Sequence, residues 1–303
     1  MSPFCHGCIG GRINSLTQRR GAVRRLQQNI TTEVCKQLNA TLIGNLGAGA
    51  FKNAYLIEHE GNRYALKIAL VSGELKARFE REVTALKGCA HPAIAKIITS
   101  GPIAHSGEDY WVIVEEYLPC GTLAERASQT VPTLNDIRHF GIVLADALGH
   151  LAGRGFVHRD IKPANILFRT PTEPVLTDFG IVRVLGEKSL TQDFMAQGPG
   201  TPQYSAPEQL LNEKSAIDWR TDQFGLALVL AELLLGYHAF SQKPSAQSRD
   251  AIISVASRET LPPTTQDHLK QCGFGCLIKA LSPWPVQRYR RPDDFIRAIS
   301  GEN

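Results

Sequence analysis

The hydrophobic pattern of this chain changes its period near residue 118, and this change restricts the folds that the chain can adopt. Between Thr41 and Ile68, apolar runs alternate with a glycine-rich turn and a polar turn, which predicts three antiparallel strands. A further strand is predicted from Tyr110 to Leu118, before the turn at 119–121. Helical spacing dominates beyond that point. We therefore expect an α+β fold with two lobes, a small antiparallel β lobe and a larger helical lobe.

The helices of both lobes are predicted from spacing and from a capping pattern. One main helix is expected in the small lobe, from four apolar residues at helical spacing: Leu75, Phe79, Val83 and Leu86. In the larger lobe, Thr133 can cap a helix together with Asp136. An apolar stripe follows them: Ile137, Phe140, Leu144, Leu148 and Leu151. The stretch from Phe224 to Leu235 is apolar nearly all round, as in a buried helix. Short strands are expected at Phe156–Val157, Ile166–Phe168 and Val175–Thr177.

Composition and charge narrow the class of protein and its partners. With 43% hydrophobic and 20% charged residues over 303 positions, the chain can bury a sizeable core. Its net charge of +4 is small for this length, so we expect no nucleic acid as partner. Its longest apolar run falls short of the roughly 20 residues that cross a bilayer, so no membrane span is expected. Seven scattered cysteines favour free thiols in a reducing compartment, and we expect a cytoplasmic protein.

The first 38 residues differ in character from the rest of the chain. Five arginines precede the first acidic residue, Glu33: Arg12, Arg19, Arg20, Arg24 and Arg25. Apolar residues recur among them at helix-like spacing: Leu16, Val23, Leu26, Ile30 and Val34. We expect a partly helical basic extension at 1–38 that packs on the small lobe, with contact to an anionic partner as the alternative. The lobes are then expected at 39–118 and 119–303.

A glycine-rich turn and a strand lysine indicate a phosphate site in the small lobe. The segment 46–51, Leu-Gly-Ala-Gly-Ala-Phe, lies between two predicted strands, where glycines let backbone N–H groups approach a phosphate. A plain hairpin turn has a similar pattern, so this segment alone is weak support. Lys67 lies inside an apolar strand, where a lysine is costly unless an anion such as ATP accompanies it. Glu82 on the next predicted helix can reach Lys67 and hold it in position.

The most informative segment runs from Val157 to Leu167 and reads VHRDIKPANIL. Asp178, Phe179 and Gly180 follow shortly after it. Phosphoryl transfer requires a carboxylate at the substrate hydroxyl, a cation at the γ-phosphate and oxygen ligands for Mg²⁺. A set of four residues supplies these groups: Asp160, Lys162, Asn165 and Asp178.

With these motifs the chain resembles the eukaryotic-type serine/threonine protein kinase superfamily from about Leu42 to the C-terminus. The amino-acid sequence from Gly200 to Gln209 is similar to that of bacterial members of the superfamily. The resemblance implies a two-lobed kinase fold and transfer of the γ-phosphate of ATP to serine or threonine, with Mg²⁺ or Mn²⁺ as cofactor. The lysine of Asp160-Ile161-Lys162-Pro163 resembles the serine/threonine branch, and Ala206-Pro207-Glu208 favours a protein substrate over a small molecule.

The resemblance also assigns individual roles. It implies Asp160 as catalytic base, Lys162 as the contact to the γ-phosphate and Lys67 as the contact to the α- and β-phosphates. Asn165 and Asp178 are the implied metal ligands. The other implied nucleotide contacts are Leu46, Gly47, Gly49, Ala54, Ala65, Glu116, Leu118 and Leu167. In the larger lobe, Asp222 is expected to brace the catalytic loop, and Glu208 to form a buried ion pair with Arg288.

Activation by phosphorylation is a further expectation. Arg159 and Arg183 are placed to gather a phosphate group from the segment 186–197. This segment precedes the stretch from Gly200 to Glu208, which resembles the loop that docks a peptide substrate in the family. The candidate regulatory hydroxyls are Ser189, Thr191 and Thr201. A transient dimer is the form in which one copy would phosphorylate another.

Three positions depart from the family pattern, and two other functions stay open. Lys52 stands where the family usually has a glycine of the phosphate turn, and Ala54 stands where it has a valine. Glu115 stands where the family has an apolar residue behind the adenine. Its carboxylate can pair with Lys67 or form a local hydrogen bond. Alternatively, the alignment with the family is shifted by one residue at this point. A pseudokinase scaffold would be expected to lack one or more of Lys67, Asp160, Asn165 and Asp178, all of which are present. A small-molecule kinase would phosphorylate a sugar or an aminoglycoside and no protein.

Overall fold

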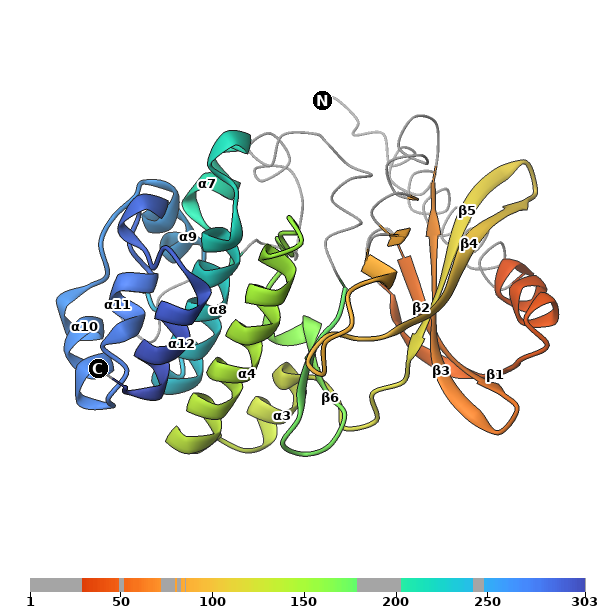
Figure 1. The fold of residues 1–303 in the computed structure, drawn as a ribbon, viewed down its shortest axis with the longest axis horizontal. Helices are drawn as coiled ribbons and strands as arrows, with labels where there is room; N and C mark the ends of the chain where they lie inside the picture. Colours follow the sequence, from red (N-terminus) through yellow and green to blue (C-terminus); the bar gives the residue numbers. More distant parts are fainter. Residues whose placement is uncertain are drawn as a thin grey trace, which may run out of the picture. The chain divides into compact units, whose positions relative to one another are not determined.

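The computed structural model describes residues 29–48, 52–71, 80, 83–84, 86–178, 203–241 and 248–302. The chain divides into two compact units (Figure 1). The first unit comprises residues 1–76 and 97–117, and the second unit comprises 77–96 and 118–303. The first unit is built on an antiparallel sheet and the second is mainly helical. The predicted α+β class with a β lobe and a helical lobe is therefore confirmed.

The sheet of the first unit has five antiparallel strands in the order β1-β2-β3-β5-β4. The strands are β1 (Thr41–Ala48), β2 (Lys52–His59), β3 (Asn62–Leu70), β4 (Ile97–His105) and β5 (Glu108–Glu116). The first three are the strands that the sequence predicts between Thr41 and Ile68. The strand predicted from Tyr110 to Leu118 is β5, which begins and ends two residues earlier.

Strand β4 is not predicted by the sequence pattern. It lies at the edge of the sheet, where it pairs only with β5 among the described residues. Its interior contains Gly101 and Pro102, which lower the strand signal. An edge position tolerates proline because one side of the strand needs no ladder hydrogen bond.

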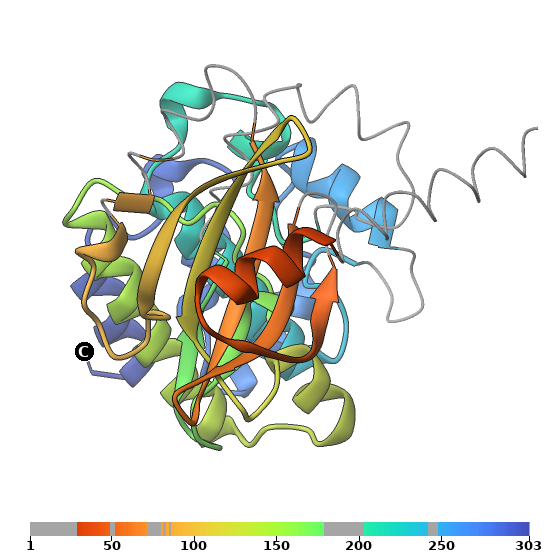
Figure 2. The ribbon, with the colours of Figure 1, turned by 90° about the vertical axis from the view of Figure 1, so that its right-hand side faces the viewer.

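The described part of the N-terminal extension is helical at residues 29–37 and covers one face of this sheet (Figure 2). Ile30 and Val34 of this helix are buried in a cluster with Leu66 and Ile68 of β3. This is the packing that the apolar spacing predicts. Since side chains alternate along a strand, Lys67, between Leu66 and Ile68, belongs to the opposite face of the sheet.

In the second unit, helices pack around the two longest ones that the structure describes, at residues 134–152 and 219–235. The helices are α3 (Leu123–Gln129), α4 (Leu134–Ala152), α7 (Pro207–Leu210), α8 (Trp219–Leu235), α9 (Ser248–Ala256), α10 (Pro263–Gln271), α11 (Cys276–Ala280) and α12 (Pro292–Ser300). Single 3₁₀ turns lie at Pro163–Asn165, Lys214–Ala216 and Pro285–Gln287. Helix α4 packs against α8 and α12, side by side in Figure 1. The predicted capping pair is present, because Thr133 and Asp136 bond reciprocally at the start of α4.

Two short strands carry the segment that matters for function. β6 (Ile166–Phe168) and β7 (Pro174–Leu176) pair in an antiparallel hairpin. The strand predicted at Phe156–Val157 is wrong, since these residues form no ladder. The Phe156 N–H group instead donates to Leu151 O at the end of helix α4, at 3.0 Å. The N–H groups of the two residues after Val157, His158 and Arg159, donate to the Asp222 side chain. The main-chain N–H groups that follow Val157 therefore bond to the carboxylate of Asp222 in helix α8 and not to a neighbouring strand.

The main helix predicted for the small lobe lies largely outside the described residues. Val83 and Leu86, at its C-terminal end, are helical and buried. The neighbouring segment joins the second unit through hydrogen bonds from Ala95 N to Leu176 O and from Leu176 N to Ala93 O.

Candidate active site

In the second unit, Asp222 of helix α8 holds the segment 157–165, which we call the catalytic loop after the role that the resemblance implies for it. The Asp222 carboxylate accepts hydrogen bonds from the N–H groups of His158, at 2.6 Å, and Arg159, at 2.7 Å. Burial raises the pKa of Asp222 to about 7, and these two donors act in the opposite direction. Asp222 is thus placed to brace the loop, as the family resemblance implies.

The Asp160 side chain is surrounded by the two partners that the sequence motif predicts beside it. Lys162 Nζ lies 2.9 Å from Asp160 Oδ2, and Asn165 Nδ2 lies 2.8 Å from the same oxygen. Asn165 Nδ2 also donates to the Asp160 carbonyl oxygen at 2.8 Å. The Asp160 side chain remains 29% exposed. A carboxylate with this orientation and exposure can receive a proton from an incoming hydroxyl group.

His158 connects this loop to the strand that precedes Asp178. Its Nε2 lies 2.9 Å from Thr177 O, and its Nδ1 accepts the Asp160 N–H at 3.3 Å. Thr177 N donates in turn to Asn165 O at 3.0 Å. Asn165 and Asp178 are the two residues predicted to bind metal. Because Thr177 directly precedes Asp178, its main-chain bond to Asn165 holds these two residues close together.

Asn165 and Asp178 offer the ligand type that a hard divalent cation requires. The Asn165 amide directs its nitrogen at Asp160, so its oxygen is the atom available to a cation. Asp178 adopts a left-handed backbone conformation, with φ of 61°. Across the described ranges, no group of three or more His, Cys, Asp and Glu side chains forms a metal cluster. This donor set suits Mg²⁺ or Mn²⁺, which take few protein ligands beside phosphate and water, better than Zn²⁺.

In the first unit, Lys67 is paired with Glu115. The Lys67 ammonium donates to the Glu115 carboxylate, and both side chains are nearly buried. The pairing of β3 with β5 places Ala65 opposite Glu115 and Lys67 opposite Ile113, so the ion pair joins diagonal neighbours on one face of the sheet. Of the alternatives that the sequence leaves open for Glu115, the structure has the pair with Lys67.

The remaining nucleotide contacts expected in the first unit fall on the same sheet. Ala54 of β2 lies opposite Lys67 of β3, so both belong to the face that also carries Ala65. Leu46 is exposed on β1. Gly47, with φ of 143°, has its N–H bonded to Asn45 Oδ1 at 2.7 Å. The end of β5 carries Glu116.

In the second unit, Leu118 and Leu167 lie in one apolar cluster with Ala95 and Val175. Six predicted residues are outside the described part of the chain: Gly49, Glu82, Arg183, Ser189, Thr191 and Thr201. The side chain of Lys52 is not described either.

Helix α7 begins within Ala206-Pro207-Glu208, which we call the docking motif because the resemblance links it to a protein substrate, and the helix is anchored at two points. Arg288 forms a bidentate pair with Glu208, at 2.7 and 3.0 Å, and both side chains are fully buried. Gln209 also bonds to the catalytic loop, because its Nε2 donates to Arg159 O at 2.9 Å. The first contact follows from the resemblance. The second has no signal in the sequence, since the two residues lie 50 positions apart.

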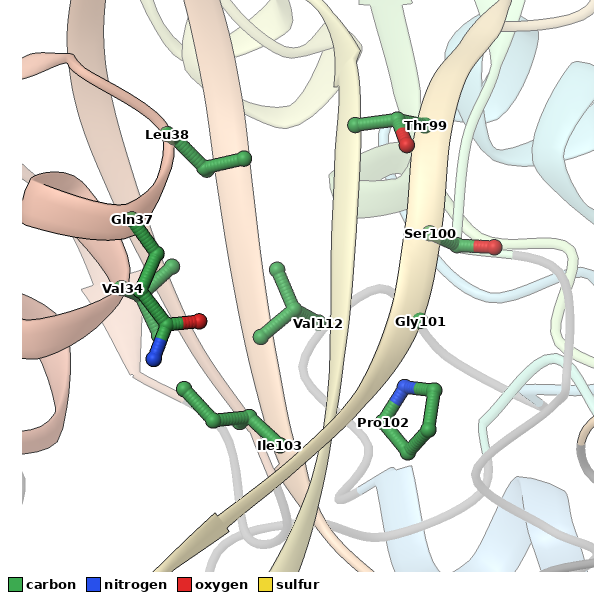
Figure 3. A pocket seen from close by; sticks show the side chains of 9 residues that line it. All are labelled: Val34, Gln37, Leu38, Thr99, Ser100, Gly101, Pro102, Ile103 and Val112. Atoms are coloured by element: carbon green, nitrogen blue, oxygen red, sulfur yellow. The ribbon is translucent and has the colours of Figure 1, made fainter.

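A cavity of about 170 Å³ in the first unit is separate from the predicted nucleotide contacts (Figure 3). It is lined by residues of helix 29–37, the turn that follows this helix, β4 and β5: Val34, Gln37, Leu38, Thr99, Ser100, Gly101, Pro102, Ile103 and Val112. Val112 belongs to the face that the helix covers, whereas Lys67 belongs to the other face. This cavity is therefore not where Lys67 would meet ATP.

The fold and the loop around Asp160 together define the class of two-lobed kinase domains. A family model for the protein kinase domain matches residues 40–281. The chain belongs to the protein kinase domain family.

Several individual relatives are bacterial. The chain is 31% identical to the serine/threonine-protein kinase PknF of Mycobacterium tuberculosis over 275 residues, which are 86% of this chain and 55% of PknF. It is 35% identical over 224 residues to a probable serine/threonine-protein kinase of Streptomyces coelicolor, covering 73% of this chain and 32% of the relative. It is 28% identical over 236 residues to PknB of Mycobacterium tuberculosis, and the match covers 74% of this chain and 36% of PknB. The predicted resemblance to bacterial serine/threonine kinases is confirmed.

The chain spans about half the length of PknF and about a third of the other two relatives. In the part of this chain that the structure describes, none of the helices has the length and apolar character needed to cross a membrane.

Proposed function

We propose that this chain is an ATP-dependent protein kinase that transfers the γ-phosphoryl group of ATP to serine and threonine hydroxyls of protein substrates. The observation that carries the proposal is the Asp160 carboxylate, held beside the Lys162 ammonium and the Asn165 amide. The names of the relatives support serine and threonine as acceptors.

In the proposed reaction, one P–O bond breaks and another forms. The bond between the γ-phosphorus and the oxygen that bridges it to the β-phosphate breaks, and ADP leaves with that oxygen. The substrate oxygen forms the new bond to phosphorus, and its proton passes to Asp160 Oδ1 or Oδ2. Lys162 stabilises the negative charge of the transferred group. The Lys162 side chain is 39% exposed, so it is accessible to a phosphate group.

The family implies ATP and a divalent cation, and the described residues fit both. Asn165 and Asp178 would hold the cation, which when bound offsets negative charge on the phosphates. Lys67 would contact the α- and β-phosphates from the sheet, with Glu115 fixing its ammonium. The expected contacts to the rest of the nucleotide are Leu46, Gly47, Gly49, Ala54, Ala65, Glu116, Leu118 and Leu167.

Activation by autophosphorylation is the finer part of the proposal. Arg159 is supported by the main-chain hydrogen bond to Asp222 and stands directly before Asp160. With Arg183 it would bind a phosphate on Ser189, Thr191 or Thr201. If one copy phosphorylates another in a transient dimer, the initial rate of autophosphorylation per molecule rises with protein concentration. Phosphosite mapping tests the sites, and full activity of Thr191→Ala in the absence of phosphate at 186–197 would contradict them.

The cellular setting and the lobe boundaries are also proposed. The five described cysteines are free thiols, which supports a reducing compartment such as the cytoplasm. We retain 39–118 and 119–303 as the functional lobes, with 1–38 as an extension of the first.

The central experiment is incubation with labelled ATP and Mg²⁺ on a generic protein substrate, with Asp160→Asn and Asp178→Ala beside the wild type. We expect transfer by the wild type and a loss of at least 100-fold in both variants, while ATP binding to Asp160→Asn stays within about threefold. Equal rates for the wild type and Asp160→Asn would overturn the proposal. Transfer to a sugar or an aminoglycoside and none to protein would also do so.

A further inference from the structure

The peptide unit that joins Arg159 to Asp160 is held at both of its polar ends. Its carbonyl oxygen, on Arg159, accepts from Gln209 Nε2 at 2.9 Å. Its N–H group, on Asp160, donates to His158 Nδ1 at 3.3 Å. Because a peptide unit is planar, fixing both groups fixes the plane and the direction in which Asp160 leaves it.

The backbone at this point needs such support. Arg159 has φ of 64°, in the left-handed region that residues with a Cβ atom seldom adopt. The N–H group of Arg159 is bonded to Asp222 Oδ1 at 2.7 Å. Asp222 therefore holds the peptide unit before Arg159, and Gln209 holds the one after it.

Gln209 is itself fixed. It is 5% exposed, and its Oε1 accepts the N–H of Ala206 at 3.1 Å, which closes the first turn of α7. The preceding residue, Glu208, is paired with Arg288. Both ends of the Gln209 amide are thus occupied, one by the docking motif and the other by the catalytic loop.

We propose that Gln209 is a positioning residue that orients the Asp160 carboxylate through the Arg159 carbonyl group, so that the catalytic loop depends on helix α7. The proposal rests on the proposed function, in which Asp160 accepts the proton of the substrate. It adds a residue to which the kinase resemblance gives no role. Through Ala206, it also links the docking motif to the catalytic carboxylate.

Gln223 of helix α8 provides a matched control. It is 0% exposed, its Nε2 donates to Tyr289 O at 3.1 Å, and its Oε1 accepts Tyr289 N at 3.1 Å. Gln209 and Gln223 are thus both buried amides that bridge two main-chain groups. Only Gln209 reaches the catalytic loop.

The test compares Gln209→Met with Gln223→Met. Methionine has a similar length, and in both variants a buried amide is replaced by an apolar group, so similar decreases in melting temperature are expected. We expect kcat to fall tenfold or more in Gln209→Met, while KM for ATP and ATP affinity stay within about twofold. In Gln223→Met, kcat should stay within about twofold below its melting temperature. The proposal is overturned if Gln209→Met keeps wild-type kcat, or if both variants lose it equally.

Two further measurements keep the result decisive. If Gln209→Met does not fold, Gln209→Asn retains an amide that is one methylene too short for both contacts, and the same fall in kcat is expected. Hydrogen exchange at the Asp160 amide should be faster in the Gln209 variant than in Gln223→Met. This exchange does not depend on kinase activity, so it tests the positioning role even if the wild type transfers no phosphate. Equal exchange in the two variants would contradict that role.

Discussion

Replacement of Arg288 by methionine is predicted to destabilise the second unit severely. The guanidinium group makes two hydrogen bonds to Glu208 and three to the carbonyl oxygens of Ser282, Arg220 and Pro283, at 2.9, 3.0 and 3.2 Å. Neither side chain of the ion pair is exposed. The substitution therefore strands a buried carboxylate together with three backbone acceptors.

The magnitude follows from these contacts. Breaking a buried ion pair by removing one partner costs about 3 to 5 kcal/mol, because the remaining charge stays desolvated. The three carbonyl groups each lose a hydrogen bond with a net contribution of about 0.5 to 1.5 kcal/mol. Together these losses come to about 4.5 to 9.5 kcal/mol. Glu208 keeps the Thr221 hydroxyl as a donor at 2.8 Å, which favours the lower half of this range. We expect a decrease of about 4.5 to 7 kcal/mol in the free energy of unfolding, or roughly 9 to 28 °C in melting temperature.

Urea unfolding followed by circular dichroism measures this decrease, and a second variant tests its cause. In the double variant Glu208→Gln with Arg288→Met, no charge is left buried, so we expect it to be more stable than Arg288→Met alone by about 2 kcal/mol. A loss below about 1 kcal/mol for Arg288→Met would refute the reasoning. So would a double variant that is less stable than the single one.

Three more predictions concern other parts of the chain. Glu115→Gln should lower the free energy of unfolding by about 1.5 to 3 kcal/mol in urea titrations, and by much less in a Lys67→Met background. His238 donates from Nε2 to Gln203 O, and burial lowers its pKa, so its stabilising contribution is full above the ordinary histidine pKa and is lost as pH falls below it. The stability advantage of the wild type over His238→Gln should therefore shrink between pH 7.5 and pH 5.5, and a constant advantage would contradict this. Thr133→Ala should cost about 1 kcal/mol and Thr133→Ser much less, measured by the same titration.

Features that depend on neighbouring residues are the ones that the sequence predicts well. The N-terminal cap of α4 depends on only two residues, Thr133 and Asp136, which lie three positions apart, and both of the expected hydrogen bonds between them are present. The contacts of Asp160 with Lys162 and Asn165 likewise join residues within five positions. Such contacts can be predicted because the chain has few ways of arranging so short a segment.

Features that depend on register or on distant residues are predicted poorly. Glu115 and Lys67 are 48 positions apart, and only the pairing of β3 with β5 decides that they meet. The sequence left three alternatives for Glu115 for this reason. β4 is not predicted because Gly101 and Pro102 in its interior lower the strand signal, and only its place at the edge of the sheet allows this proline. At Phe156–Val157 the apolar residues indicated a strand, but a carboxylate 64 positions from His158 takes up the main-chain donors that follow.

At the start of helix α7, a residue of an ion pair and an amide occupy adjacent positions, and the geometry of a helix gives a physical reason for this arrangement. Adjacent side chains on a helix point in different directions, so Glu208 can bond to Arg288 while Gln209 bonds to Arg159. The ion pair fixes α7 within the second unit, and the amide transmits that position to the catalytic loop. A short helix of four residues has too few backbone hydrogen bonds to hold itself in place. Its position, and through it the direction of the Asp160 carboxylate, therefore depends on side chains whose partners lie 50 and 80 positions away.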